Sequence, residues 1–285
     1  MPSKYAFIAD NLDHFYKYPQ EYYMKPFRIY GNLWFVGNRD VGSYLLDTGD
    51  GLILIDTTYP ETRAQMIQSI WEAGFDPRNI RYILHTHGHF DHFGATDFLV
   101  KLSGAETFLG EADARMFRER PELALIGEAR YTYLETFHVD HEIHDGDCIS
   151  LGNTRIRCIA CPGHTLGVMC FVMELEENGV KKTAGLYGGI GTGTVCRDFV
   201  EEMGTWAYRE HFIDSLEKVR HLHIDITLGN HTAQNDTEGK ALRMAEHPEG
   251  ENPFIDPGEW ERFIVKAEET YNRMLADEAA GTDRL

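Results

Sequence analysis

IRYILHTHGHFDH, residues 80–92, joins an apolar run to four histidines and one aspartate. Neutral imidazole is the commonest protein ligand for zinc and related metals, and carboxylate oxygens complete such ligand sets. A hydrophobic core gains nothing from so many desolvated polar rings, which disfavours a packing role. The apolar run indicates a buried strand that ends at Leu84, so the stretch predicts a metal site where that strand opens into a loop.

Spacing within this stretch predicts ligands for two neighbouring ions. In an extended segment His87 and His89 lie on the same side of the chain. The turn into the following helix brings Asp91 and His92 toward a second position. Two later segments repeat the pattern of an apolar run, a glycine and a histidine, and they end at His164 and His231. Six ligands give three for each ion, which is typical of a catalytic site that keeps an open position.

Length and patterning predict a single α/β domain over residues 1–285. Residues 1–26 form an N-terminal arm that packs on the domain or covers a cleft, and residues 240–285 form a helical extension. Strands are expected at 28–37, 42–47, 51–56, 80–84, 106–109, 148–151, 154–161, 169–174, 183–187 and 225–228, and helices at 62–73, 95–102, 111–120, 209–219 and 259–280. The order of these elements predicts two mixed β-sheets packed face to face with helices outside, a four-layer sandwich.

Composition limits the partners of the chain. The formal net charge of −19 disfavours binding to nucleic acid or anionic membranes and favours a small-molecule substrate. No stretch is long and apolar enough for a membrane span, and residues 1–11 lack a secretory pattern. We therefore expect a cytoplasmic protein, or the mature form of an exported one. Five cysteines, an odd number, favour reduced thiols, and the Cys158-x-x-Cys161 pair is interpreted as part of the core.

Three motifs in this order resemble the metallo-β-lactamase superfamily of αβ/βα metallohydrolases. They are Thr86-His87-Gly88-His89-Phe90-Asp91-His92, Pro162-Gly163-His164-Thr165 and the late His231. The resemblance extends over roughly residues 27–235 and implies the αβ/βα fold. It implies that His87, His89 and His164 bind the first metal and that Asp91, His92 and His231 bind the second. Asp56 would orient a ligand histidine by hydrogen bonding, with a simple turn cap as the alternative.

The segment Tyr187-Gly188-Gly189-Ile190-Gly191-Thr192-Gly193 departs from much of the superfamily. Many members carry a metal-bridging aspartate here, whereas this chain has Gly188 and Gly189 and no acid. In lacking this bridging aspartate the chain resembles the third subclass of zinc β-lactamases, which bind zinc with three histidines plus Asp-His-His. The substrate-contacting serines of that subclass would fall near Ile190 and Thr192. Ile190 cannot donate a hydrogen bond to a substrate carboxylate, which puts β-lactam recognition in question.

The resemblance implies a dinuclear zinc hydrolase that uses a metal-bound hydroxide, oriented by the catalytic Asp91, to open a cyclic amide of β-lactam type or a related ester or lactone. The alternatives are an iron-dependent oxidoreductase of the same fold, a lactonase or thioesterase without β-lactam activity, and a metal-binding protein without turnover. The N-terminal arm or the C-terminal helix could form a homodimer. Among the remaining histidines, His85 is expected to pack or hydrogen-bond near the motif. Solvated or surface positions are expected for His138, His141, His144, His221 and His223.

Overall fold

The computed structural model describes residues 12–129 and 132–282, whose strands form two mixed β-sheets. The seven-stranded sheet contains, in spatial order, β1 (Phe27–Tyr30), β2 (Leu33–Phe35), β3 (Tyr44–Asp47), β4 (Leu52–Ile55), β5 (Ile80–Leu84), β6 (Glu106–Gly110) and β7 (His141–Ile143). The five-stranded sheet contains β12 (Ile226–Gly229), β11 (Val180–Tyr187), β10 (Met169–Glu177), β9 (Thr154–Ala160) and β8 (Cys148–Leu151).

Each sheet combines an antiparallel part with a parallel part. Strands β1 to β4 are antiparallel, whereas β4 to β7 run parallel to one another. In the second sheet β8 to β11 are antiparallel and β12 is parallel to β11. The four parallel strands of the first sheet all end at the same edge, so the loop after β5 opens there beside the loops after β4 and β6.

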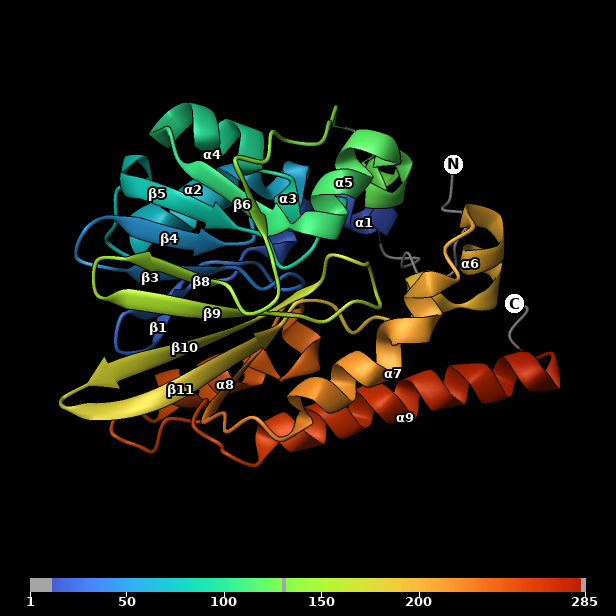
Figure 1. Ribbon diagram of the computed structural model, residues 1–285. Coiled ribbons are helices and arrows are strands. Elements are labelled where there is room, and N and C mark those ends of the chain that lie inside the picture. The colour runs from blue at the N-terminus through green and yellow to red at the C-terminus, as the bar shows by residue number, and fades with distance from the viewer. Residues whose placement is uncertain (1–11, 130–131, 283–285) are drawn as a thin grey trace.

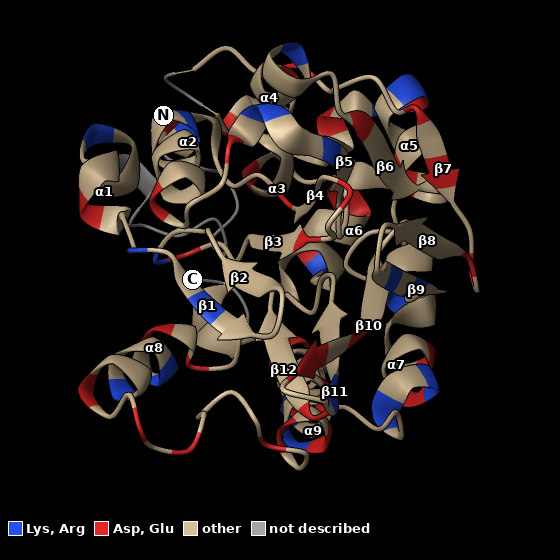
Figure 2. Cartoon of the chain, turned by 90° about the vertical axis from the view of Figure 1, so that its left-hand side faces the viewer, with Lys and Arg blue, Asp and Glu red and all other residues tan. Residues whose placement is uncertain are grey.

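The sequence of β4 shows why the sheets become inner layers. All four of its residues are buried, as expected for a strand covered on both faces. Ile53 and Ile55 lie in the core between the sheets, whereas Leu52 and Leu54 belong to a separate core under the helices. Figure 1 and Figure 2 show α2 (Arg63–Glu72) and α4 (Thr96–Ser103) on one outer side, and α7 (Ala207–Arg220) and α9 (Glu259–Ala280) on the other. The predicted four-layer sandwich is confirmed.

The bounds expected for the strands and helices differ from the observed ones mainly in short or charged segments. The range 28–37 is a hairpin and not one strand, because Gly31 turns the chain with a φ of 53°. Strands β10 and β11 extend further than predicted, into a charged hairpin that turns at Asn178 and Gly179. The remaining helices are α1 (Leu12–Lys17), α3 (Phe90–Phe93), α5 (Glu111–Glu119), α6 (Arg197–Met203) and α8 (Thr237–Glu246). Short 3-10 turns occupy Pro19–Tyr22, Pro60–Thr62, Pro77–Asn79, Pro121–Ala124, Ile126–Glu128, Gly193–Val195 and Thr232–Gln234.

Both ends of the described chain pack on the sandwich. Phe15 of α1 is buried, with its ring centroid 4.4 Å from that of Tyr59. Trp260 of α9 donates a hydrogen bond to the carbonyl of Val219 at the end of α7. Residues 1–11 of the predicted arm lie outside the described residues. Within the described ranges, no helix combines the length and the apolar character that crossing a bilayer requires.

Candidate metal centre

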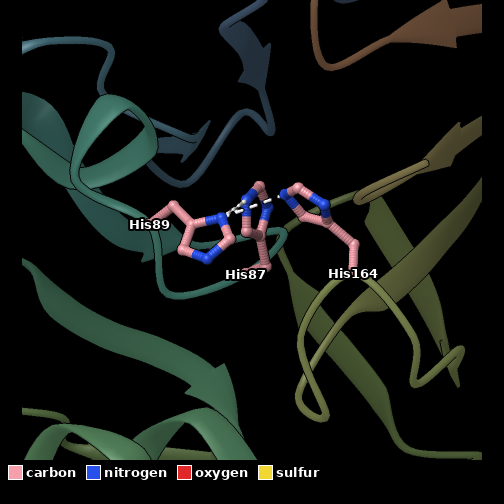
Figure 3. Close-up of side chains that lie close together, drawn as sticks. All are labelled: His87, His89 and His164. Carbon is pink, nitrogen blue, oxygen red and sulfur yellow. Dashed lines mark hydrogen bonds between the residues drawn. The ribbon is translucent and has the colours of Figure 1, made fainter. Parts of the chain in front are cut away.

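Three imidazole rings converge where the β5–α3 loop meets the β9–β10 loop (Figure 3). His87 and His89 come from the first loop and His164 comes from the second. Nδ1 of His89 lies 3.0 Å from Nε2 of His87 and 3.0 Å from Nε2 of His164. The three rings therefore turn one nitrogen each toward a common point, and these residues form the first ligand set.

A second ligand set lies directly beside the first. Asp91 and His92 belong to the short helix α3, and His231 follows β12. Oδ2 of Asp91 lies 3.3 Å from Nε2 of His92 and 3.4 Å from Nε2 of His231. The ring centroids of His87 and His92 are 4.3 Å apart, so the two ligand sets are in direct contact. The structure thus brings together all six residues that the sequence predicted as ligands.

Hydrogen bonds to the outer ring nitrogens leave the inner nitrogens free to bind a metal. Nδ1 of His164 lies 2.8 Å from the carbonyl oxygen of Gly191, which can only accept. Nδ1 of His92 lies 2.9 Å from Oδ2 of Asp56, which accepts its proton. Nδ1 therefore carries a proton in both rings and Nε2 is turned toward the ligand set, the arrangement seen in metal-ligating histidines. Nε2 of His92 is buried and faces Oδ2 of Asp91, its neighbour in the second set, at 3.3 Å.

The two sets differ in charge. Burial lowers the pKa of His87 and His89 well below the usual range and that of His164 to about 4, so these rings stay neutral. In the second set burial opposes the charges, but Asp91 and Asp56 outweigh it and raise the pKa of His92 to about 9. Burial alone would raise the pKa of Asp91, but His92 and His231 hold it well below its usual range. The second set thus pairs a carboxylate with histidines whose positive charge it favours, whereas the first set is neutral.

Asp56 lies behind His92, at the end of β4. Its φ of 57° is in the left-handed region, which Asp tolerates better than most residues. This conformation aims the buried carboxylate at the motif, where it accepts hydrogen bonds from the backbone and hydroxyl of Thr86 at 2.8 and 2.7 Å. Asp56 also accepts a hydrogen bond from Nδ1 of His92, so three donors contact this carboxylate. The contact to Nδ1 of His92 is the one that the predicted orienting role requires, and the contacts to Thr86 are those of the cap alternative.

Two further carboxylates at the centre were missed by sequence reasoning. Asp40 lies 3.4 Å from Nδ1 of His231 and accepts a 2.7 Å hydrogen bond from the hydroxyl of Tyr59. Asp113 is buried in the first turn of α5, behind the loops that carry the first set. Neither belongs to a motif. In sequence Asp40 resembles a turn residue and Asp113 a helix-start acid, both of which are common on protein surfaces.

The backbone of segment 188–194 packs closely against the side chain of His164. A Cβ at Gly189 would lie 2.8 Å from Cδ2 of His164, so only glycine fits this approach without a shift. Thr194 donates a 2.6 Å hydrogen bond to the carbonyl of His164. Ile190 is half-buried and packs against the core, and Thr192 is half-buried just before a 3-10 turn. The loop therefore supports a ligand histidine with backbone, and it offers no bridging acid.

The other histidines and the cysteines lie outside both sets. His85 is fully buried and contacts the carbonyl of Phe108 at 3.0 Å and the hydroxyl of Thr96 at 2.8 Å, which confirms the predicted packing role. The side chains of His138, His141, His144, His221 and His223 are exposed. All five cysteines are free thiols, and Cys158 and Cys161 are buried in the core as predicted.

Residues 36–177, which include five of the six ligand-set residues, match the family model of the metallo-beta-lactamase superfamily. The chain belongs to this superfamily. Its structure is similar to that of BJP-1, a subclass B3 metallo-beta-lactamase of Bradyrhizobium japonicum, with a TM-score of 0.82 and 25% identity over 93% of this chain and 99% of that chain. The likeness to the third subclass that the motifs indicated is confirmed at the level of structure.

Curated relatives match this superfamily member over only part of their length. The lactamase-like protein adaB of Aspergillus niger is 27% identical over 74% of this chain and 56% of its own length. A probable polyketide biosynthesis zinc-dependent hydrolase, PksB of Bacillus subtilis, is 28% identical over 43% of this chain and 45% of its own length. The chain thus spans about half the length of the curated relatives that it matches.

Proposed function

We propose that this protein is a dinuclear zinc hydrolase that opens a cyclic amide of β-lactam type or a related ester or lactone. The observation that carries the proposal is the pair of adjacent three-residue ligand sets, each with converging ligand atoms. Five of the six ligands are histidines, a composition that suits zinc, although iron also accepts histidine and carboxylate. The similarity to PksB, a probable zinc-dependent hydrolase, supports the same metal.

The residues of the chain provide two kinds of environment for the reaction. When bound, zinc lowers the pKa of a water and polarises a carbonyl oxygen. The neutral set of His87, His89 and His164 leaves the full charge of its ion for the substrate. Asp91 faces both of its histidine partners with Oδ2, which leaves Oδ1 to orient the attacking water. Asp91 is therefore the proposed catalytic carboxylate as well as a ligand.

The surroundings of the sets favour a substrate with a neutral carbonyl. Ile190 offers no hydrogen bond where the β-lactamases of the third subclass would place a serine. The partly exposed Asp40 beside His231 is a hydrogen-bond acceptor only, so it offers no donor to a substrate carboxylate. Both features favour lactones and neutral cyclic amides over the carboxylate-bearing β-lactam antibiotics within the proposed class.

The test is kcat/KM for a carbapenem, a cephalosporin, a lactone and a thioester, measured on protein reconstituted with two equivalents of zinc. We expect chelator-sensitive hydrolysis of at least one of the two β-lactams or of the lactone, and its loss in His87→Ala. Turnover of the thioester alone would favour the thioesterase alternative. Full activity in His87→Ala would contradict the proposal. Bound iron with oxygen uptake, in place of zinc with hydrolysis, would instead identify the oxidoreductase alternative.

A further inference from the structure

Asp113 is a buried carboxylate that contacts both loops of the first ligand set without being a ligand. It lies in the first turn of α5 and is 1% exposed. Oδ2 accepts hydrogen bonds from the backbone of Gly88 at 2.7 Å and from the hydroxyl of Thr165 at 2.6 Å. Oδ1 accepts a hydrogen bond from the backbone of Gly167 at 2.9 Å. One carboxylate therefore joins two loops that are far apart in the sequence.

The groups that donate hydrogen bonds to Asp113 belong to residues next to the ligands in the sequence. Gly88 separates His87 from His89, and Thr165 directly follows His164. Every residue of the first set is thus one position from a group that Asp113 holds. The second set is supported elsewhere, because His92 is held by Asp56 and His231 faces Asp40.

Glycines make the close approach to Asp113 possible. A Cβ at Gly167 would lie 2.4 Å from Cγ of Asp113, and one at Gly110 would lie 2.1 Å from the carbonyl oxygen of Gly167. A Cβ at Gly88 would lie 2.8 Å from the side chain of Met116. Residues 88 and 167 therefore lack side chains where the two loops pack on the start of α5, and this packing encloses the carboxylate.

We propose that Asp113 is a positioning residue for the first metal ion, and that it acts on this ion independently of the second. The inference rests on the metal assignment of the proposed function, but not on any substrate. The carboxylate fixes the separation of the β5–α3 and β9–β10 loops, and so the distance between His164 and the other two rings. Partners of this kind, one step behind the ligands, typically change metal affinity about 10–100-fold when they are removed.

Asp113→Asn is the sharpest variant because it keeps the size of the side chain and removes one acceptor. An asparagine has one oxygen, so its amide nitrogen must face either Gly88 or Gly167, and both of these offer an N–H. One of these two backbone N–H groups therefore loses its acceptor in either orientation. Thr165→Val is a milder second variant that removes only the hydroxyl contact and leaves both backbone contacts in place.

The experiment measures cobalt(II) affinity, by visible absorption, in two single-site backgrounds. His231→Ala leaves the first set intact, and His87→Ala leaves the second set intact. We expect Asp113→Asn to weaken cobalt binding about 10–100-fold in the His231→Ala background, with a changed absorption spectrum. In the His87→Ala background we expect the affinity to stay within about threefold, because Asp113 contacts no residue of the second set.

Asp225→Asn is the matched control. Asp225 is another buried carboxylate, and it accepts a 2.9 Å hydrogen bond from the backbone of Thr183, away from both sets. We expect this variant to leave cobalt binding unchanged in both backgrounds. Equal weakening of both sites by Asp113→Asn, or no weakening of the first, would overturn the inference. Because the readout is binding, a protein that holds two ions but hydrolyses none of the tested substrates would contradict the proposed function alone.

Discussion

Replacing Asp56 with asparagine tests how the second ligand set is oriented. Asp56 accepts three hydrogen bonds, two from Thr86 and one from Nδ1 of His92. Asparagine has one acceptor oxygen and cannot serve all three donors. If its amide nitrogen faces Thr86, a buried backbone N–H is left without a partner. If it faces His92, the ring must move its proton to Nε2 and can no longer bind a metal through that atom.

The size of both effects follows from these contacts. A buried donor without a partner costs about 1–3 kcal/mol, so we expect the unfolding free energy of the metal-free protein to fall by that amount. Loss of the orienting carboxylate should weaken the second ion about 10–100-fold, which corresponds to roughly 1.4–2.8 kcal/mol. Urea unfolding measures the first effect, and equilibrium dialysis against zinc with a competing chelator measures the second.

Asp140→Asn provides the matched control for this prediction. Oδ2 of Asp140 accepts hydrogen bonds from the backbone and hydroxyl of Thr107, both at 2.9 Å, and its Oδ1 lies 3.6 Å from the exposed His138, which belongs to neither ligand set. We expect this control to lose some stability and to bind both zinc ions as the parent protein does. Two zinc ions bound to Asp56→Asn with unchanged affinity would refute the orienting role.

Three further predictions concern the loop, the charges and the thiols. Gly189→Ala should lower affinity for the first ion, since its Cβ would meet the ring of His164, and cobalt titration would show an unchanged constant if the loop simply moves away. The pKa of His92, raised to about 9 from 6.5, should make the metal-free protein lose stability as pH rises through this window, because the folded state holds a proton that the unfolded state has released; a flat urea midpoint from pH 6.5 to 9 would contradict this. A thiol reagent should label the exposed Cys148 in the folded protein and reach Cys158, whose pKa burial raises to about 12, only after unfolding; mass spectrometry of the labelled peptides decides.

Periodic, strongly apolar segments were predicted well from the sequence. The ranges expected for β5, β8 and α9 coincide with the observed ones, because their pattern of burial follows the period of the element. Strand β7 and helix α6 were missed. Strand β7 has three residues, two of them exposed, and α6 has only seven residues, so neither is long enough to show a clear apolar stripe.

The ligands could be predicted because they are concentrated in short motifs, whereas their supports could not. Asp113 and Thr165 are 52 positions apart, and Asp40 and His231 are 191 positions apart. Only the folded chain brings such residues together, and a lone aspartate in a turn or helix start carries no signal of its own. Asp56 could be placed only because the resemblance to a family pointed to it.

The central claim is that the two ligand sets hold two ions at once, and elemental analysis tests it most directly. Zinc-reconstituted protein is dialysed exhaustively, and its zinc and iron are then counted per chain in the parent protein, in His87→Ala and in His231→Ala. The account predicts two zinc ions in the parent and one in each variant. A parent protein that keeps a single ion, or that loses none in either variant, would contradict it.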